Sequence, residues 1–280
     1  MPFLRHVSLS IVLLASSAVF SADTTPEGIP REAKKAEGIS ANGVEFWQDK
    51  NSLFLRMSAP QSELRVPRFA NVVRQISAGA ESDKISLHPE PTEWVLRGIP
   101  DGTTILNLEL DEPFQAFDPA LAITTDDKGM LWLPAKRAKV TGSTLRFEPQ
   151  PHKNTIGYWS NEKDHASWEV SVSAAQTFEV DILQGCGKGH GGTTVRLEAG
   201  DSHLDFIVQD TGHFQNFVWR TLGALTLSKG RSTITLHPQN KQAGAVMDVR
   251  AVRLVPVGTR RSMTPELADP EAFTDKNAIQ

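Results

Sequence analysis

The chain has 280 residues, a formal net charge of −4 and a single cysteine, Cys186. One cysteine excludes an internal disulfide, and a chain of this length can bury a core without one. Charges of both signs are mixed along the sequence, without the basic stripe that a nucleic-acid-binding surface requires. We therefore expect a folded protein that has no internal disulfide and no nucleic-acid partner.

Residues 1–22 have the pattern of a secretory signal peptide. Arg5 and His6 precede a short apolar run, and Val19 and Ser21 occupy the small-residue positions before a cleavage site. The run is shorter than the roughly 20 apolar residues that span a bilayer, with an uncleaved anchor as the alternative. The pattern predicts a secreted or periplasmic protein that does not insert into a membrane after signal cleavage.

The first half of the chain has a polar lead and then alternating apolar residues. Residues 23–39 are rich in Pro, Glu and Lys, which predicts a flexible lead. Three period-two runs follow, at Leu53–Met57, Trp94–Leu96 and Leu106–Leu110. Turn sequences separate these runs and no helical period is present. We predict a small β-sandwich over residues 40–113 and a linker over residues 114–120.

The second half predicts more short strands at close spacing. They are expected at Met130–Leu133, Ser167–Val172, Thr177–Leu183, Thr194–Glu198 and Leu204–Val208, with a hairpin turn at Ser228–Arg231. Many short strands without helices predict a jelly roll, here over residues 121–257. The polar residues 258–280 predict a loose tail. The expected fold class is all-β, with two consecutive β-sandwiches of which the second is a jelly roll.

The last predicted strand changes phase near Arg250–Ala251. Met247 and Val249 share one parity, whereas Val252 and Leu254 share the other. A one-residue slip moves every following side chain to the opposite face of the sheet, and a β-bulge restores the pattern. We predict a bulge at this position.

Five blocks of the second half resemble a known family. They are Asn154–Trp159 (NTIGYW), Ala166–Val170 (ASWEV), Gln184–Gly192 (QGCGKGHGG), Thr211–Phe217 (TGHFQNF) and Val246–Val252 (VMDVRAV). In this order they resemble the galactose-binding-type jelly roll of family-6-like carbohydrate-binding modules, most closely the kind appended to bacterial α-L-fucosidases. The resemblance covers Leu121–Pro256. It implies a jelly roll that binds a glycan.

The first half more faintly resembles the C-terminal sandwich of the same fucosidases. Glu45–Asp49 and Leu53–Met57 match its beginning, and Asn107–Asp111 matches its end. A catalytic (β/α)₈ barrel needs roughly 250 residues, and only residues 23–39 separate the signal from the first sandwich. We therefore expect a chain without catalytic activity.

One departure from the family concerns calcium. Related modules often begin with Ala-Glu, whose carboxylate helps to hold a structural Ca²⁺, whereas this chain has Ala135-Lys136. Asp248 remains at the matching position of the last strand. Because Ca²⁺ requires several oxygen ligands, a lone carboxylate beside an ammonium predicts no calcium there.

Sugar binding requires an aromatic face for the pyranose ring and a few polar groups for its hydroxyls. Tyr158, the only tyrosine, and Trp159 adjoin the polar loop 160–165. Neighbours in a strand point to opposite faces, so one of the two is expected in the core and the other is the candidate platform. The alternative is that both are structural.

Two further loops supply polar candidates. Lys188 and His190 lie in a segment with five glycines, where backbone could approach a ligand closely. The alternative is an ordinary hairpin loop with solvated charges. By resemblance to the family, His213 and Asn216 supply ligand contacts from the turn after Thr211-Gly212. The predicted carbohydrate-binding residues are therefore Tyr158, Trp159, Lys188, His190, His213 and Asn216.

Other chemistries are not expected. Cys186, His190 and His213 lack the tight spacing of a metal site, and we expect no metal and no cofactor. The carboxylates Glu162, Asp164, Asp210 and Asp248 are dispersed in sequence, and solvation explains each of them. No nucleophile turn is present.

Together these patterns predict a non-catalytic protein that binds a polysaccharide, fucosylated or sulfated. The alternative is a structural or assembly protein that docks to another secreted protein, such as a glycosidase. A minor hydrolase is a third possibility.

Overall fold

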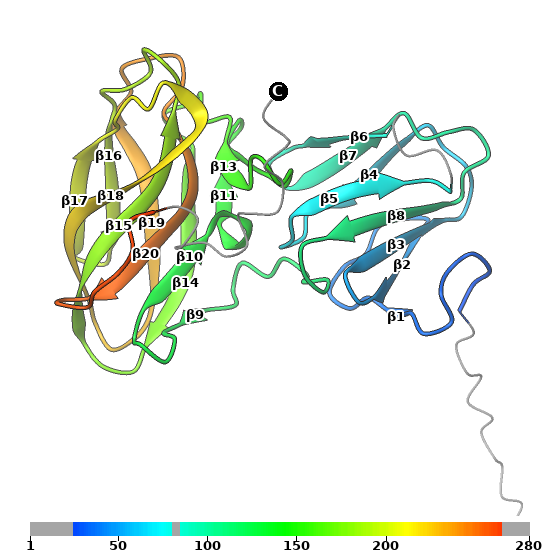
Figure 1. The fold of residues 1–280 in the computed structure, drawn as a ribbon, viewed down its shortest axis with the longest axis horizontal. Coiled ribbons are helices and arrows are strands. Elements are labelled where there is room, and N and C mark those ends of the chain that lie inside the picture. The colour runs from blue at the N-terminus through cyan, green and yellow to red at the C-terminus, as the bar shows by residue number, and fades with distance from the viewer. Residues whose placement is uncertain (1–24, 80–84, 265–280) are drawn as a thin grey trace, which may run out of the picture.

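The protein consists of two β-sandwich lobes that lie side by side (Figure 1). The computed structural model describes residues 25–79 and 85–264; the predicted signal peptide lies outside them. Within these residues the one helix is a short 3₁₀ turn, Ala135–Arg137, and no helix is long and apolar enough to cross a membrane. The predicted fold class is therefore confirmed as all-β.

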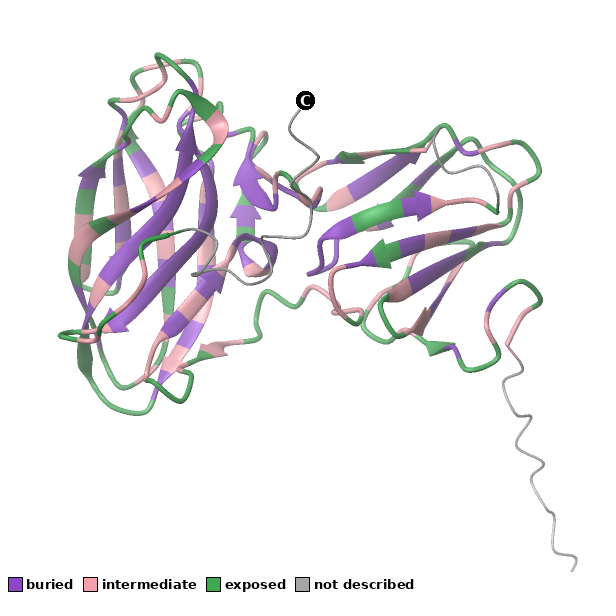
Figure 2. Ribbon diagram, in the orientation of Figure 1, coloured by how far each residue is buried: buried purple, intermediate pink, exposed green. Residues whose placement is uncertain are grey.

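The first lobe is built from two antiparallel sheets. Its strands are β1 (Lys34–Lys35), β2 (Val44–Asp49), β3 (Ser52–Met57), β4 (Glu63–Pro67), β5 (Val73–Ser77), β6 (Ser86–Pro89), β7 (Glu93–Arg97) and β8 (Ile105–Leu110). One sheet has the order β1-β2-β3-β8-β5 and the other has the order β4-β7-β6. The period-two runs identified in the sequence form β3, β7 and β8, and burial alternates along β8 (Figure 2). In β3 and β7 the intervening residues Phe54 and Val95 are buried as well, and Phe54 packs with Ile29, Ala33 and Trp47 in a separate cluster. The alternation along β8 is what a strand with one buried face requires.

The second lobe is also a two-sheet sandwich. Its strands are β9 (Ile123–Thr124), β10 (Leu131–Pro134), β11 (Lys139–Thr141), β12 (Arg146–Glu148), β13 (Thr155–Gly157), β14 (His165–Val172), β15 (Gln176–Cys186), β16 (Thr194–Ala199), β17 (Ser202–Ile207), β18 (His213–Leu227), β19 (Gly230–Asn240) and β20 (Asp248–Pro256). One sheet has the order β12-β13-β20-β15-β18, with β10 paired to β20. The other has the order β11-β14-β19-β16-β17, with β9 paired to β14. The chain crosses repeatedly between the two sheets, as in a jelly roll.

The predicted β-bulge in the last strand is confirmed. Leu183 pairs with Ala251 and Gln184 pairs with Val249, so Arg250 is the extra residue of β20. Val249 and Val252 can therefore both face the core, where each is fully buried. The apolar pattern alone was enough to locate this irregularity.

The segment expected to be a flexible lead is instead packed on the first lobe. Lys34 and Lys35 pair with β2, and Ile29 and Ala33 are buried in one cluster with Trp47 and its neighbours. Composition alone predicted a solvated segment, but its apolar residues Ile29 and Ala33 pack on the first lobe. The beginning of the predicted tail is also held in place, because Arg261 pairs with Asp181 on β15. Residues 265–280 lie outside the described part.

The two lobes share one continuous apolar core. Phe147 of the second lobe lies 6.3 Å from Trp94 of the first, measured between ring centroids, and one buried cluster includes both. The amide of Val73 also donates to Pro149 O at 2.9 Å. Within the predicted linker, Gln115 O accepts the amide of Ala70, and the Gln115 amide donates to Asn71 Oδ1 of the first lobe. The lobes are therefore docked against each other rather than joined by a loose tether.

A buried cation reinforces this junction. The Lys136 ammonium lies 3.2 Å from Asp111 Oδ2 and 2.6 Å from Glu112 Oε1, both at the end of the first lobe. The side chains of Lys136 and Asp111 are each 5% exposed. Lys136, whose ammonium argued against calcium in the sequence, thus forms an ion pair between the lobes.

Candidate functional site

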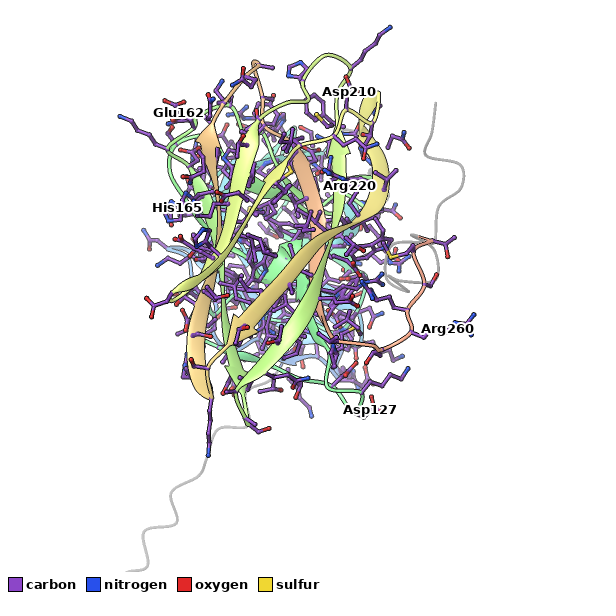
Figure 3. The ribbon with its side chains drawn as sticks, turned by 90° about the vertical axis from the view of Figure 1, so that its left-hand side faces the viewer. Asp127, Glu162, His165, Asp210, Arg220 and Arg260 are labelled. Carbon is purple, nitrogen blue, oxygen red and sulfur yellow. The ribbon has the colours of Figure 1, made fainter. Side chains whose placement is uncertain are left out.

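Four loops of the second lobe meet at one end of the sandwich, which we call the loop end: residues 158–164, 186–193, 208–213 and 241–247. Glu162 and Asp210 mark this end in Figure 3, opposite Asp127. Backbone hydrogen bonds join the loops: Val246 N donates to Trp159 O at 2.8 Å, and Thr211 N donates to Cys186 O at 3.1 Å. All six predicted site residues lie in these loops or at the strand ends beside them.

Tyr158 is the exposed aromatic residue of the loop end. Its side chain is 58% exposed, and its backbone φ is +60°. A bulky residue in the left-handed region is strained, by roughly 1–2 kcal/mol, and such residues are concentrated at functional sites. The Arg146 guanidinium covers one face of the ring, with Cζ 3.5 Å from the centroid. The exposed part of the ring remains accessible to a ligand.

Trp159 is not a platform, which corrects its place among the predicted binding residues. It is 1% exposed, and its indole Nε1 donates to Asp164 O at 3.0 Å. The expected alternation of two neighbouring aromatics therefore holds, with Tyr158 pointing outward and Trp159 inward. The left-handed backbone of Tyr158 lies at the point where the outward-facing and the inward-facing side chain diverge.

Asp164 organises the loop beneath Tyr158. The carboxylate accepts hydrogen bonds from the amides of Ser143, Thr144 and Leu145 at 2.7–2.9 Å, and from the Thr144 hydroxyl. Burial by itself would raise the pKa of Asp164, but these hydrogen bonds outweigh it and lower the pKa. The expectation that solvation explains this carboxylate is wrong, because the residue is fully buried.

The glycine-rich loop makes room for an aromatic side chain. A Cβ on Gly187 would lie 2.5 Å from the Phe214 ring, so only glycine fits there. His190 packs edge-on against Phe214, with ring centroids 5.2 Å apart. Its Nδ1 accepts the amide of Ala245 at 3.1 Å, so the neutral imidazole carries its proton on Nε2 and offers a donor. Part of the expected space for a ligand is therefore filled by Phe214.

The remaining predicted residues are exposed at the same end. Lys188 and His213 are exposed, and His213 Nδ1 accepts the amide of Gln215 at 3.1 Å. The Asn216 amide nitrogen donates to Thr211 O at 2.6 Å. This leaves Asn216 Oδ1 and the imidazole Nε2 of His213 as the groups able to meet a ligand.

Two carboxylates, Glu148 and Asp248, converge beneath the loop end. A Cβ on Gly157 would lie 2.6 Å from Glu148 Oε2 and 2.8 Å from Asp248 Oδ1. Burial, and then the charge of Glu148, raises the pKa of Asp248 well above its usual range. Glu148 Oε1 pairs with Lys153 Nζ at 2.6 Å. The sequence showed neither this proximity nor the burial of Asp248.

The residues at the position where calcium was considered from the sequence, Lys136 and Asp248, do not fit a calcium ion. The Lys136 ammonium is directed to Asp111 and Glu112, and Lys153 already neutralises the carboxylate nearest Asp248. Over residues 25–79 and 85–264, no three His, Cys, Asp or Glu side chains gather closely enough to hold a metal ion. Burial, with the nearby Asp210 and Asp248, raises the pKa of Cys186 to about 11, so its thiol stays protonated.

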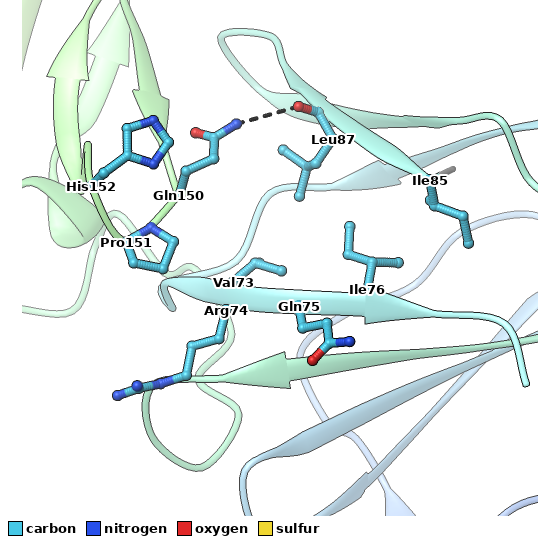
Figure 4. Close-up of a pocket in the computed structure, with 9 residues that line it drawn as sticks. All are labelled: Val73, Arg74, Gln75, Ile76, Ile85, Leu87, Gln150, Pro151 and His152. Atoms are coloured by element: carbon cyan, nitrogen blue, oxygen red, sulfur yellow. Dashed lines mark hydrogen bonds between the residues drawn. The ribbon is translucent and has the colours of Figure 1, made fainter. Parts of the chain in front are cut away.

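A groove of about 330 Å³ opens between the lobes (Figure 4). Its lining residues are Val73, Arg74, Gln75, Ile76, Ile85, Leu87, Gln150, Pro151 and His152. Gln150 Nε2 donates across the groove to Leu87 O at 3.3 Å, and burial lowers the pKa of His152. The lining mixes aliphatic and polar residues and lacks the Trp, Tyr or Phe face on which a sugar ring stacks. The loop end is the better candidate for glycan binding.

Sequence reasoning missed two residues of the loop end, Arg146 and Asp164. Arg146 lies in a short strand, and nothing in its local pattern distinguishes it from a surface arginine. Asp164 occupies a polar loop in which an exposed carboxylate is the ordinary expectation. Both roles depend on strands and loops that the fold brings together.

No protein-family model matches the chain, and no curated protein matches it. Among solved structures, a family 35 carbohydrate-binding module from Clostridium thermocellum has 12% identity and a TM-score of 0.37, covering 46% of this chain and 98% of that module. The C-terminal family 6 module of a marine laminarinase from Zobellia galactanivorans has 15% identity and a TM-score of 0.37, covering 45% and 98%.

Two larger enzymes are also similar. An α-L-fucosidase from Vibrio sp. strain EJY3 has 14% identity and a TM-score of 0.33 over 81% of this chain. A Podospora anserina mannanase that carries a family 35 module has 15% identity and a TM-score of 0.36 over 48% of this chain. The chain spans 42% of the fucosidase and 29% of the mannanase. At this distance, ligand and activity have to be argued from the residues of this chain.

Proposed function

We propose that the protein binds a polysaccharide at the loop end, with Tyr158 as the stacking platform. The observation that carries this proposal is the exposed ring of Tyr158, held in a strained left-handed conformation. A pyranose presents a face of C–H groups that packs on an aromatic ring. Lys188, His190, His213 and Asn216 would provide hydrogen-bonding groups around it. A fucosylated or sulfated glycan is the ligand class we favour.

The proposed role is non-catalytic. Hydrolysis of a glycosidic bond ordinarily needs two carboxyl groups that flank the substrate. Glu148 and Asp248 approach each other, but they are 4% and 5% exposed, which gives a substrate no access to them. The first lobe then serves as a rigid support, because it shares its core with the second. The signal-peptide pattern of residues 1–22 supports a secreted or periplasmic location.

The test is a glycan array with the purified protein lacking residues 1–22. The array contains fucosylated, sulfated and neutral polysaccharides and is read with and without a calcium chelator. We expect binding that survives chelation and that is lost in Tyr158→Ala. The matched control is Phe46→Leu, a conservative change in the first lobe, which should bind as the wild type does. If the folded wild type binds no glycan on the array, the proposal is refuted.

A further inference from the structure

Arg146 is an unusual cation at the loop end. It donates no hydrogen bond and forms no ion pair within the described ranges 25–79 and 85–264; its contact there is the face of Tyr158, 3.5 Å from the ring centroid. Its Nε is buried without a partner, whereas its terminal nitrogens are not buried. A guanidinium carries five donors and stays charged in a protein. A fixed cation with unmet donors beside an exposed ring indicates a ligand group.

The fold holds Arg146 in this position. Arg146 pairs with Gly157 across β12 and β13, directly before Tyr158. Tyr158 has a left-handed backbone conformation, and its ring is exposed and stacks on the Arg146 guanidinium. The stack restricts both side chains before any ligand arrives, which reduces the entropy lost on binding.

The charges nearby do not neutralise Arg146. Glu148, two residues along the same strand, is paired with Lys153 at 2.6 Å. Arg250 donates to the carbonyls of His152 and Lys153, and so adds a third cation to this side of the sheet. Lys153 and Arg250 both act on Asp248, a carboxyl group that burial and the charge of Glu148 hold against ionisation. The local field favours an anion.

We propose that Tyr158 and Arg146 form a subsite for an acidic sugar residue, which carries a carboxylate or a sulfate ester. The pyranose face lies on the open side of Tyr158, and the anionic oxygens accept hydrogen bonds from the terminal nitrogens of Arg146. The planar guanidinium can bind two oxygens at once, which the lysine ammonium cannot do with the same geometry. This inference rests on glycan binding at the loop end and names the residue that selects its ligand.

The test compares matched acidic and neutral polysaccharides by isothermal titration calorimetry with the full mature chain. The pairs are polygalacturonate with its methyl ester, and a sulfated galactan with its desulfated form. We expect the wild type to prefer an acidic member roughly 10- to 100-fold. Arg146→Gln should lower acidic binding to the neutral level, and Arg146→Lys should recover part of the preference. Which pair shows the preference distinguishes carboxylate from sulfate.

The outcomes separate this inference from the proposed function. Equal binding of acidic and neutral members by the wild type would overturn the acidic subsite and leave glycan binding intact. If Arg146→Gln keeps the wild-type preference for acidic ligands, Arg146 is not part of the acidic subsite. Tyr158→Ala should lose both acidic and neutral ligands, whereas Arg56→Gln, an exposed arginine of the first lobe, should behave as the wild type. Absence of binding to every polysaccharide would overturn both. Circular dichroism of each variant checks that it is folded.

Discussion

Two regions of the molecule place an arginine over an aromatic ring, with opposite consequences. At the junction, Arg68 lies 4.0 Å from the Phe117 ring centroid and donates to Lys136 O and Ala138 O at 2.7 and 3.2 Å. At the loop end, Arg146 lies 3.5 Å from the Tyr158 ring without such acceptors among the described residues. Arg68 is buried, whereas Arg146 is partly exposed and stacks on an exposed ring.

The two arginines differ in how many of their N–H donors have acceptors in the protein, and this difference indicates different roles. Arg68 is 5% exposed, and burial lowers its pKa to about 9. Its Nε is buried without a partner, as is that of Arg146, but both of its terminal nitrogens donate to carbonyls, which compensates an expensive charge. Such a group stabilises one arrangement of the two lobes. Arg146 keeps contact with solvent and has donors to spare, so it can exchange water for a ligand. The contrast supports a structural role for the junction and the binding role proposed for the loop end.

The largest effect is expected at the junction, in Lys136→Ala. Removing the ammonium leaves Asp111, whose side chain is 5% exposed, without its cation. We expect the free energy of unfolding to fall by about 3–5 kcal/mol, as for other broken buried ion pairs. Urea denaturation measures it. Lys35→Ala, which removes an exposed ion pair with Glu45, should cost less than about 1 kcal/mol; equal losses would contradict the role of the junction.

A smaller loss of stability is expected at the base of the loop end, in Asp164→Ala. The change leaves the amides of Ser143, Thr144 and Leu145 without their acceptor, at a cost of about 2–3 kcal/mol at neutral pH. The pKa of Asp164 is lowered by folding, so its contribution is present above the unfolded pKa and declines as pH falls through the folded value.

Denaturation of the wild type and of Asp164→Ala at pH 7 and at pH 3 checks this dependence. The difference between the two proteins should narrow at the lower pH. A difference that stays constant over this range would show that the charge of Asp164 contributes nothing.

Tyr158→Gly and Tyr158→Ala form a matched pair that separates strain from binding. Both variants lack the ring and should bind glycan at least about 10-fold more weakly. Glycine adopts a φ of +60° without strain, so Tyr158→Gly should be more stable than Tyr158→Ala by about 1 kcal/mol. Calorimetric melting and glycan titration measure the two effects. If either variant binds glycan with wild-type affinity, Tyr158 is not the stacking platform.

The smallest effect on stability is expected for Arg146→Gln. The exposed cation–π contact contributes up to about 1 kcal/mol, and no hydrogen bond to a described residue is lost. Urea denaturation should therefore give a change below about 1 kcal/mol. A loss as large as that of Lys136→Ala would make Arg146 a structural residue like Arg68, and the contrast between the two regions would disappear.

The sequence by itself determined the strands and one irregularity among them. The alternation in Leu53–Met57 and Ser167–Val172 identifies β3 and β14, and the phase change near Arg250 identifies the bulge. These patterns are local, because a strand with one buried face requires apolar residues at every second position. The candidate loops were also found, because their polar and aromatic residues stand between strands.

Only the tertiary structure decided which groups meet. Lys136 looked like a defect in a calcium site until Asp111 and Glu112 of the other lobe were placed against it. Arg146 and Tyr158 are twelve positions apart and become neighbours through the pairing of β12 with β13. Charge pairing, burial and unmet donors are properties of neighbours in space. A linear pattern that repeats every second residue carries no information about them.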